Sequence, residues 1–184
     1  NPSVMDAAPL ARFPALITYK GLTGNVFVQG VEPPYLRYAG VSATAGTVFT
    51  DADAGDTNSV MLSPAVLKLF GIENPDEFVG QKVSFRLLIP AEDGTNANTE
   101  VVIDKEFTVR GITKEEGVLN AMMMLPELRN YVGVEEYERV QVRVDTNENL
   151  PIVEKRLIDE GYRVTALSKT VEQASKIFQG IQAV

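Results

Sequence analysis

The side chains that could do chemistry in this chain are its carboxylates, serines and methionines. The 184 residues include no histidine, no cysteine and no tryptophan. Without histidine or cysteine, the chain cannot build a Ser-His or Cys-His nucleophile, a thiolate zinc site or an iron–sulfur cluster. A Ser-Lys nucleophile needs the spacing Ser-x-x-Lys, and no serine here has a lysine three residues later. These routes to covalent and metal catalysis are therefore closed.

The densest group of carboxylates is the loop Asp51-x-Asp53-x-Gly55-Asp56, whose spacing is close to that of a calcium loop. An EF-hand loop needs Asp or Asn at its fifth position, glycine at its sixth and a bidentate Glu at its twelfth. Here the fifth and sixth residues are reversed, and the twelfth is Leu62. We therefore expect a solvated turn rather than a cation site.

The methionine run 122–124 and the acidic pairs 115–116 and 135–136 also have structural explanations. Alternate residues of a strand point to opposite faces, so the three thioethers of 122–124 could not converge on Cu(I), and methionine commonly fills cores. Adjacent glutamates do not converge on a substrate as a catalytic carboxylate pair must. We predict core methionines and solvated glutamates, and hence no catalytic residue, no metal site and no cofactor.

The composition is that of a globular protein with an acidic surface. Twenty-five acidic against seventeen basic residues give a formal charge of −8. This balance argues against nucleic acid as a partner, because phosphate binding needs a basic face. No segment approaches the about 20 consecutive apolar residues of a membrane span. With 45% hydrophobic residues, the chain can bury a core without disulfides or metals.

The elements that would position these residues are mixed helices and strands. Residues 14–31 are predicted to form a hairpin, and 60–62 a short buried strand that leads into a helix capped by Ser63. Further strands are predicted at the segments 83–89, 101–103, 107–113 and 122–125.

The C-terminal part contains the clearest pattern. Residues 139–144 alternate strictly between apolar and polar, which predicts a strand with one buried face and one solvent-exposed face. A helix beginning at Pro151 and a strand over 162–167 complete a strand–helix–strand unit. A shorter unit of this kind is predicted at 25–46. Two such units predict a ferredoxin-like split βαβ layer.

The last segment has a helical pattern. Residues 170–173, with the sequence TVEQ, match a capping box, and apolar residues from Val171 to Val184 fall on one helical stripe. We predict an amphipathic helix over 169–184 with further chain after it. It would pack either on this domain or, as we favour, against an N-terminal stalk in a longer protein.

Nine pieces of the sequence, in order, match the motifs of one family. Residues 27–35 read FVQGVEPPY, 60–71 read VMLSPAVLKLFG, and 107–112 read FTVRGI. The remaining pieces are 1–4, 45–53, 79–83, 124–126, 141–162 and 170–184. The chain resembles the extracytoplasmic core domain of MacB-type (FtsX-like) ABC transporter permeases over nearly its whole length. One departure is the loop 91–100, which is longer and more polar than the family's usual tight hairpin.

The pattern and the resemblance together lead us to expect an α+β fold in discontinuous parts. Segments 1–56 and 137–168 would form a porter-like split βαβ subdomain, and 57–136 an inserted β-rich subdomain. Residues 169–184 would begin the C-terminal stalk helix.

The resemblance also implies a mechanical function. Such permeases are anchored by transmembrane helices, with their core domains on the extracytoplasmic face of the membrane, and ATP hydrolysis by a cytoplasmic ATPase opens and closes these domains. The implied partners are the chain's own transmembrane segments, a second permease copy, the ATPase and an unknown cargo or extracytoplasmic protein. Consistently, the sequence contains no Gly-x-x-x-x-Gly-Lys-[Ser/Thr] phosphate loop.

Two other functions remain open at this point. One is a soluble extracytoplasmic binding or adaptor module of similar fold, which would lack flanking membrane spans. The other is an acid-dependent hydrolase, which would need two converging carboxylates with separated pKa values. No spacing in the sequence proposes such a pair.

Overall fold

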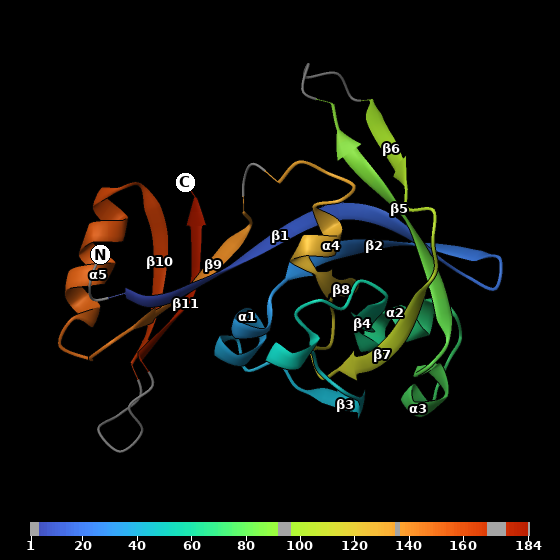
Figure 1. Cartoon of the computed structure of the whole chain (residues 1–184), viewed down its shortest axis with the longest axis horizontal. Helices are drawn as coiled ribbons and strands as arrows, with labels where there is room; N and C mark the ends of the chain where they lie inside the picture. The colour runs from blue at the N-terminus through green and yellow to red at the C-terminus, as the bar shows by residue number, and fades with distance from the viewer. Residues whose placement is uncertain (1–3, 92–96, 135–136, 169–175, 184) are drawn as a thin grey trace.

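The computed structural model describes residues 4–91, 97–134, 137–168 and 176–183. It confirms a mixed α and β fold, shown in Figure 1. The strands are β1 (Val4–Tyr19), β2 (Leu22–Val31), β3 (Ala43–Gly46), β4 (Ser59–Leu62), β5 (Lys82–Pro90), β6 (Asn98–Val102), β7 (Phe107–Thr113), β8 (Asn120–Met124), β9 (Arg139–Val144), β10 (Tyr162–Ser168) and β11 (Lys176–Ala183). The helices are α1 (Pro33–Tyr38), α2 (Pro64–Leu69), α3 (Pro75–Phe78), α4 (Leu125–Leu128), α5 (Leu150–Asp159) and the 3₁₀ turn η1 (Asp51–Asp53).

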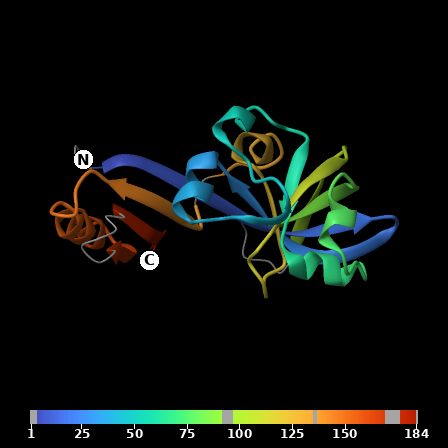
Figure 2. The same cartoon turned by 90° about the horizontal axis from the view of Figure 1, so that it is seen from below.

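The long strand β1 belongs to both halves of the molecule. Its residues from Val4 to Leu10 pair antiparallel with β9, whereas those from Ala11 to Tyr19 pair with β2. In Figures 1 and 2 the strand runs without a break from the half that contains α5 into the half that contains α2 and α3. β1 is therefore a covalent and hydrogen-bonded connection between the two halves.

The first half, called the small sheet, has the strand order β10-β11-β9-β1. β11 pairs antiparallel with both β9 and β10, so these two are parallel to each other and joined by α5. This arrangement is a split βαβ unit, and it confirms the strand–helix–strand predicted at the C-terminus. Leu150 and Val153 of α5 pack on Val142 and Val144 of β9.

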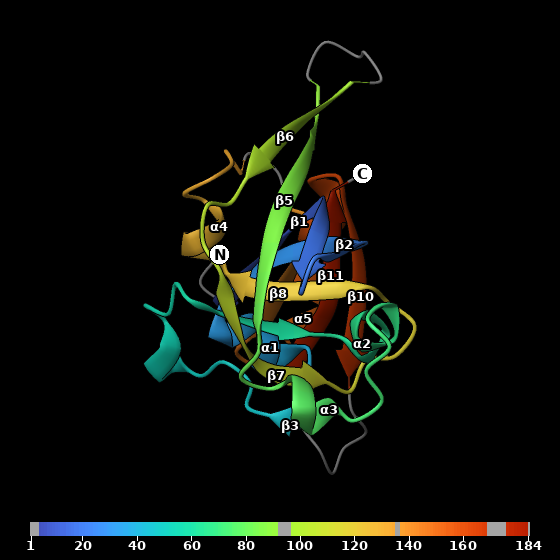
Figure 3. The same cartoon turned by 90° about the vertical axis from the view of Figure 1, so that its right-hand side faces the viewer.

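The second half, called the barrel, is a closed ring of strands. The pairings run from β1 to β2, β8, β4, β7 and β5, and a further pairing of β5 with β1 closes the ring. Its interior is the largest hydrophobic cluster and includes Ile17, Val28, Val60, Phe85 and Phe107. Figure 3 shows β5 and β6 extending together beyond the ring as a hairpin.

The shorter strand–helix–strand unit predicted at 25–46 exists but lies elsewhere than expected. β2 pairs with β1 and β8 in the barrel, and β3 pairs with β7 of the barrel, so neither strand lies in a layer with β9. The physical reason is that the parallel strand β8 occupies the edge of β2 that a βαβ layer would have needed. The division into 1–56 with 137–168 and 57–136 stays a prediction.

The helix predicted over 169–184 is wrong for the part that the structure describes. Residues Lys176–Ala183 form β11, and residues 169–175 and 184 lie outside the described ranges. Between β9 and β10 a strand pairs its backbone N–H and C=O groups on both sides. This tertiary pairing outweighs a helical apolar stripe, which is a weak preference by itself.

Ser63 precedes α2 as predicted, but its hydroxyl does not cap the helix. Its Oγ donates to the carbonyl of Val118 and accepts the backbone N–H of Asn120 at 3.0 Å. The hydroxyl therefore fastens the start of α2 to the start of β8.

Candidate functional site

The acidic loop of the sequence forms the predicted turn, with no buried residue in η1. Arg110 lies between two of its carboxylates, 3.1 Å from Asp53 and 3.2 Å from Asp56. Asp51 pairs with Arg37 at 2.8 Å. The backbone N–H of Thr50, and then Arg110, hold the pKa of Asp53 below its usual value. Within the described ranges, no group of three or more carboxylates could hold a metal ion.

The methionine run is core, as predicted. Met123 points into the barrel cluster, whereas Met122 and Met124 belong to a second cluster between the barrel wall and α1. All three are buried. Glu115 and Glu116 are exposed, and the pair 135–136 lies outside the described residues.

A buried ion pair, which the sequence did not indicate, joins α4 to the loop before β7. Glu127 is 2% exposed and accepts from Lys105 at 2.5 Å, Tyr131 at 2.7 Å and Asn130 at 3.2 Å. Burial, and then the neighbouring Glu127, raise the pKa of Tyr131 to about 12. Because each carboxylate oxygen has a donor, the cluster holds the fold together and leaves no group for a ligand.

A cleft of about 400 Å³ lies where the small sheet meets the barrel. Arg139 and Gln141 of β9 line it from one half, and Gln29 of β2 and Tyr35 of α1 line it from the other. Leu10 of β1, the last residue before the strand changes partner, contributes to the lining. The site is therefore built by both halves of the molecule.

Two glutamine side chains in this cleft are buried with unused hydrogen-bonding capacity. Gln29 is 9% and Gln141 1% exposed. The amide oxygen of each has no hydrogen-bond partner within the protein. Such a group costs about 1–3 kcal/mol when buried unpaired, so proteins rarely keep one without a use.

Tyr35 of α1, a helix that packs against β9, is a buried residue of the cleft lining. Burial raises the pKa of its phenol, although the positive charge of Arg139 opposes this rise. The phenol is therefore neutral at physiological pH and keeps its own proton available for donation.

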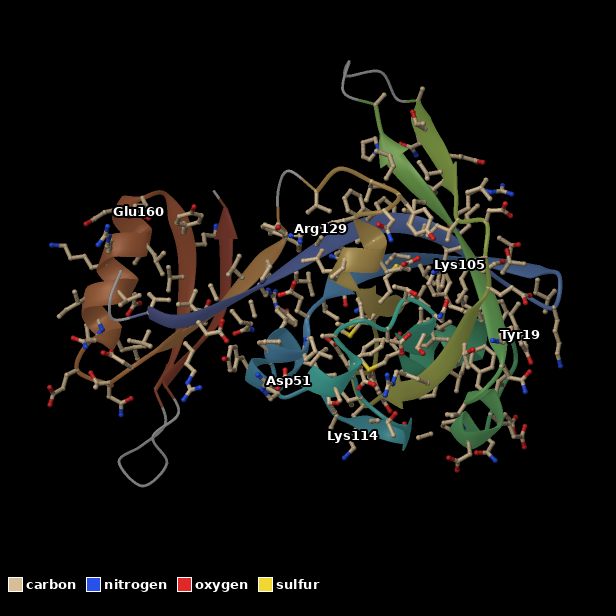
Figure 4. All side chains as sticks on the ribbon, viewed as in Figure 1. Tyr19, Asp51, Lys105, Lys114, Arg129 and Glu160 are labelled. Carbon is tan, nitrogen blue, oxygen red and sulfur yellow. The ribbon has the colours of Figure 1, made fainter. Side chains whose placement is uncertain are left out.

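The mouth of the cleft carries both signs of charge. Lys114 and Glu115 are exposed residues that follow β7 and line the cleft, and Figure 4 shows Lys114 on the β3 side of the barrel. Glu115 is the one carboxylate of the lining within the described residues. The arrangement combines donors and acceptors for binding but provides no converging carboxylate pair.

The sequence pattern of β9 did not reveal this site. The strict alternation of β9 predicted a solvent-exposed polar face, whereas Gln141 on that face is almost fully buried. The reason is that α1 packs over β9 and places Tyr35 against it. Periodicity separates the two faces of a strand, but it carries no information on which distant helix covers the second face.

Comparison with known proteins identifies the family. The sequence matches the MacB-like periplasmic core domain over residues 1–160. The chain belongs to this family. No curated protein is a significant match to the sequence.

Solved structures share the fold of this MacB-like domain. The extracellular domain of the noncanonic ABC-type transporter YknZ from Gram-positive bacteria superimposes with a TM-score of 0.62 at 17% identity, covering 97% of this chain and 81% of that one. The periplasmic region of MacB from Actinobacillus actinomycetemcomitans has a TM-score of 0.62 at 17% identity, with coverages of 87% and 67%. A domain of a putative permease from Porphyromonas gingivalis superimposes with a TM-score of 0.54 at 15% identity, covering 86% of this chain and 63% of that one.

Proposed function

We propose that this chain is the extracytoplasmic domain of an ABC transporter permease and transmits motion between a cytoplasmic ATPase and a cargo or partner outside the membrane. The family match over 160 residues carries the proposal, and the fold shared with transporter domains supports it. No helix in the described part of the chain is long and apolar enough to cross a membrane. The membrane anchor would belong to the chain's own transmembrane segments elsewhere in the protein.

The arrangement of the elements supports a mechanical role. The start of β1 and all of β11 lie in the small sheet, and the barrel with its β5–β6 hairpin lies at the other end (Figures 1 and 2). Because β1 is shared, a displacement of the small sheet is passed to the barrel through paired backbone. The proposed partners are a second permease copy, the ATPase and an unidentified cargo or extracytoplasmic protein, and no nucleic acid. The domain itself is proposed to be non-catalytic.

Spin labels can test the motion in the full permease bound to its ATPase. These 184 residues contain no cysteine, so Ile152→Cys on α5, at a residue that is 62% exposed, provides one label in this domain of each copy once any cysteine elsewhere in the permease is replaced by serine. Double electron–electron resonance should show that the distance between the spin labels of the two permease copies changes when ATP is trapped in the ATPase. An ATPase variant that cannot bind nucleotide serves as the control. An identical distance distribution with and without ATP would exclude the mechanical proposal.

A second candidate, a soluble binding module, is favoured by the polar cleft. Hydropathy of the parent gene over a window of about 19 residues separates the two candidates. Apolar spans on both sides of this segment support the permease, and their absence on both sides supports the soluble module.

A further inference from the structure

We propose that the small sheet closes over the barrel about a hinge in β1, and that an ion pair between Arg139 and Glu115 holds the closed state. Arg139 lines the cleft from β9, and Glu115 lines it from the segment that follows β7. The inference concerns a movement within one chain. It therefore goes beyond the proposed transport function and can be tested without the membrane or the ATPase.

The hinge lies where β1 changes its pairing partner. Leu10 is the last residue of β1 that pairs with β9, and Ala11 is the first that pairs with β2. Pro9, just before this point, has no backbone N–H to donate to a neighbouring strand. Within the described ranges, residues 4–10 pair with β9 alone, whereas residues 15–18 pair with both β2 and β5. The strand is held on both edges inside the barrel and on one edge at the junction, so it bends most easily at the junction.

Two opposite charges lie at the same cleft and come from the two halves. Glu115 is exposed and Arg139 is partly buried. Burial raises the pKa of Tyr35, the charge of Arg139 lowers it and that of Glu115 raises it, so both charges lie within electrostatic range of one phenol. Among the ion pairs between described residues, none joins Arg139 to Glu115. The structure therefore shows the open state, in which the two sides attract each other.

The cleft provides space for the closure and its lining provides a further reason. Its volume of about 400 Å³ can shrink as one half moves over the other. The amide oxygens of Gln29 and Gln141 are buried without a partner in the protein, which is unfavourable. Because Gln29 belongs to β2 and Gln141 to β9, a movement of the small sheet changes the surroundings of both oxygens. The open state thus leaves a cost that a second arrangement of the halves can remove.

Two spin labels on one chain can measure the closure. The 184 residues contain no cysteine, so Ile152→Cys on α5 and Ala52→Cys in η1 provide one exposed label in each half. At low ionic strength, double electron–electron resonance should resolve a shorter and a longer distance between the labels. In about 1 M NaCl, where the Debye length is about 3 Å, the population with the shorter distance should fall. A single distance that does not depend on salt would overturn the proposal.

Substitutions in the labelled chain identify the charges that hold the closed state. Glu115→Gln should lower the ratio of the shorter-distance to the longer-distance population by about two- to fivefold, the range expected for an exposed ion pair. Glu116→Gln is the matched control, because Glu116 is also exposed but does not line the cleft, and the ratio should not change. Exchange of the two charges, with Arg139→Glu and Glu115→Arg in one chain, should restore the ratio.

An equal ratio in wild type and Glu115→Gln, or an equal loss in Glu115→Gln and Glu116→Gln, would overturn the ion pair. Circular dichroism of each variant verifies that the fold is retained. Neither result affects the transport proposal, because that proposal depends on the distance between two copies in the full permease.

Discussion

Single side chains in this protein act mainly by pairing charges across loops. The ion pairs of Arg110 with Asp53 and Asp56 fasten the η1 turn to β7, and the guanidinium also lies 4.7 Å from the centre of the Phe49 ring. Asp53 further accepts from the backbone N–H and the hydroxyl of Thr50, at 2.7 and 2.9 Å. The acidic loop, whose spacing is close to that of a calcium loop, therefore has its negative charge compensated by Arg110 of the same chain.

Asp53 should make the stability of the fold depend on acid. The pKa of this carboxyl is lower in the folded state than its usual 3.8, so its contribution is complete above that value and is lost as the pH falls through the folded pKa. Asp53→Asn replaces charged hydrogen bonds by neutral ones and should lower the free energy of unfolding at pH 7 by about 1 kcal/mol. Urea unfolding measures this loss.

The difference between wild type and Asp53→Asn should shrink as the pH falls below about 4. Asp51→Asn is the matched control, because the pair of Asp51 with Arg37 is exposed and such pairs contribute about 0–1 kcal/mol. A difference that stays constant from pH 7 to pH 3 would contradict the role of the Asp53 charge.

Two glycines allow the paired backbones of β3 and β7 to approach each other and the following segment closely. Gly46 pairs with Gly111, and a Cβ on Gly111 would overlap the carbonyl oxygen of Thr47. Gly46 also adopts φ of 67°, a conformation that residues with a Cβ rarely adopt. The contact places the end of β7, and hence Thr113 in the cleft, against the β3 segment.

Gly111→Ala should destabilise the fold by about 1–3 kcal/mol, because a backbone oxygen cannot move aside as a flexible side chain can. Thermal unfolding followed by circular dichroism measures the loss. Gly55→Ala is the control, since a Cβ there meets open space and φ is not positive. Equal midpoints for the two variants would show that β3 can shift without cost.

The whole molecule is unified by β1, which supplies paired residues to the small sheet and to the barrel. Loss of β1 would open the barrel and would leave the edge of β9 in the small sheet unpaired. The cleft lies at this junction and is lined from both halves. Stability and the proposed transmission of motion therefore share one strand.

The two halves should unfold as one cooperative unit. The chain has no tryptophan, so Tyr162→Trp in β10 and Phe27→Trp in β2 provide one fluorescent reporter in each half, at partly exposed aromatic positions. We expect coincident urea midpoints for the two variants, because a shared strand couples the halves. Circular dichroism of both variants controls for any effect of the tryptophans themselves. Two separate midpoints would show that β1 does not couple the halves.

Local chemistry was sufficient to predict much of this protein. The existence of strand β9, the placement of α5 between Pro151 and Gly161, and the core methionines are all predicted by periods of two and 3.6 residues and by the backbone limits of proline and glycine, although the polar face of β9 is partly buried. The lack of histidine and cysteine excludes whole classes of catalysis on composition alone, because those reactions need an imidazole or a thiolate.

Tertiary structure alone decided which strands became neighbours. β11 is a strand because β9 and β10 leave room for one between them, and β2 lies in the barrel because β8, from a distant part of the sequence, pairs along it. Gln29 and Gln141 are far apart in the sequence, and only the tertiary structure places both in the lining of one cleft. The physical reason is that backbone pairing and burial are satisfied between distant segments, and a local pattern does not specify which distant segment will satisfy them.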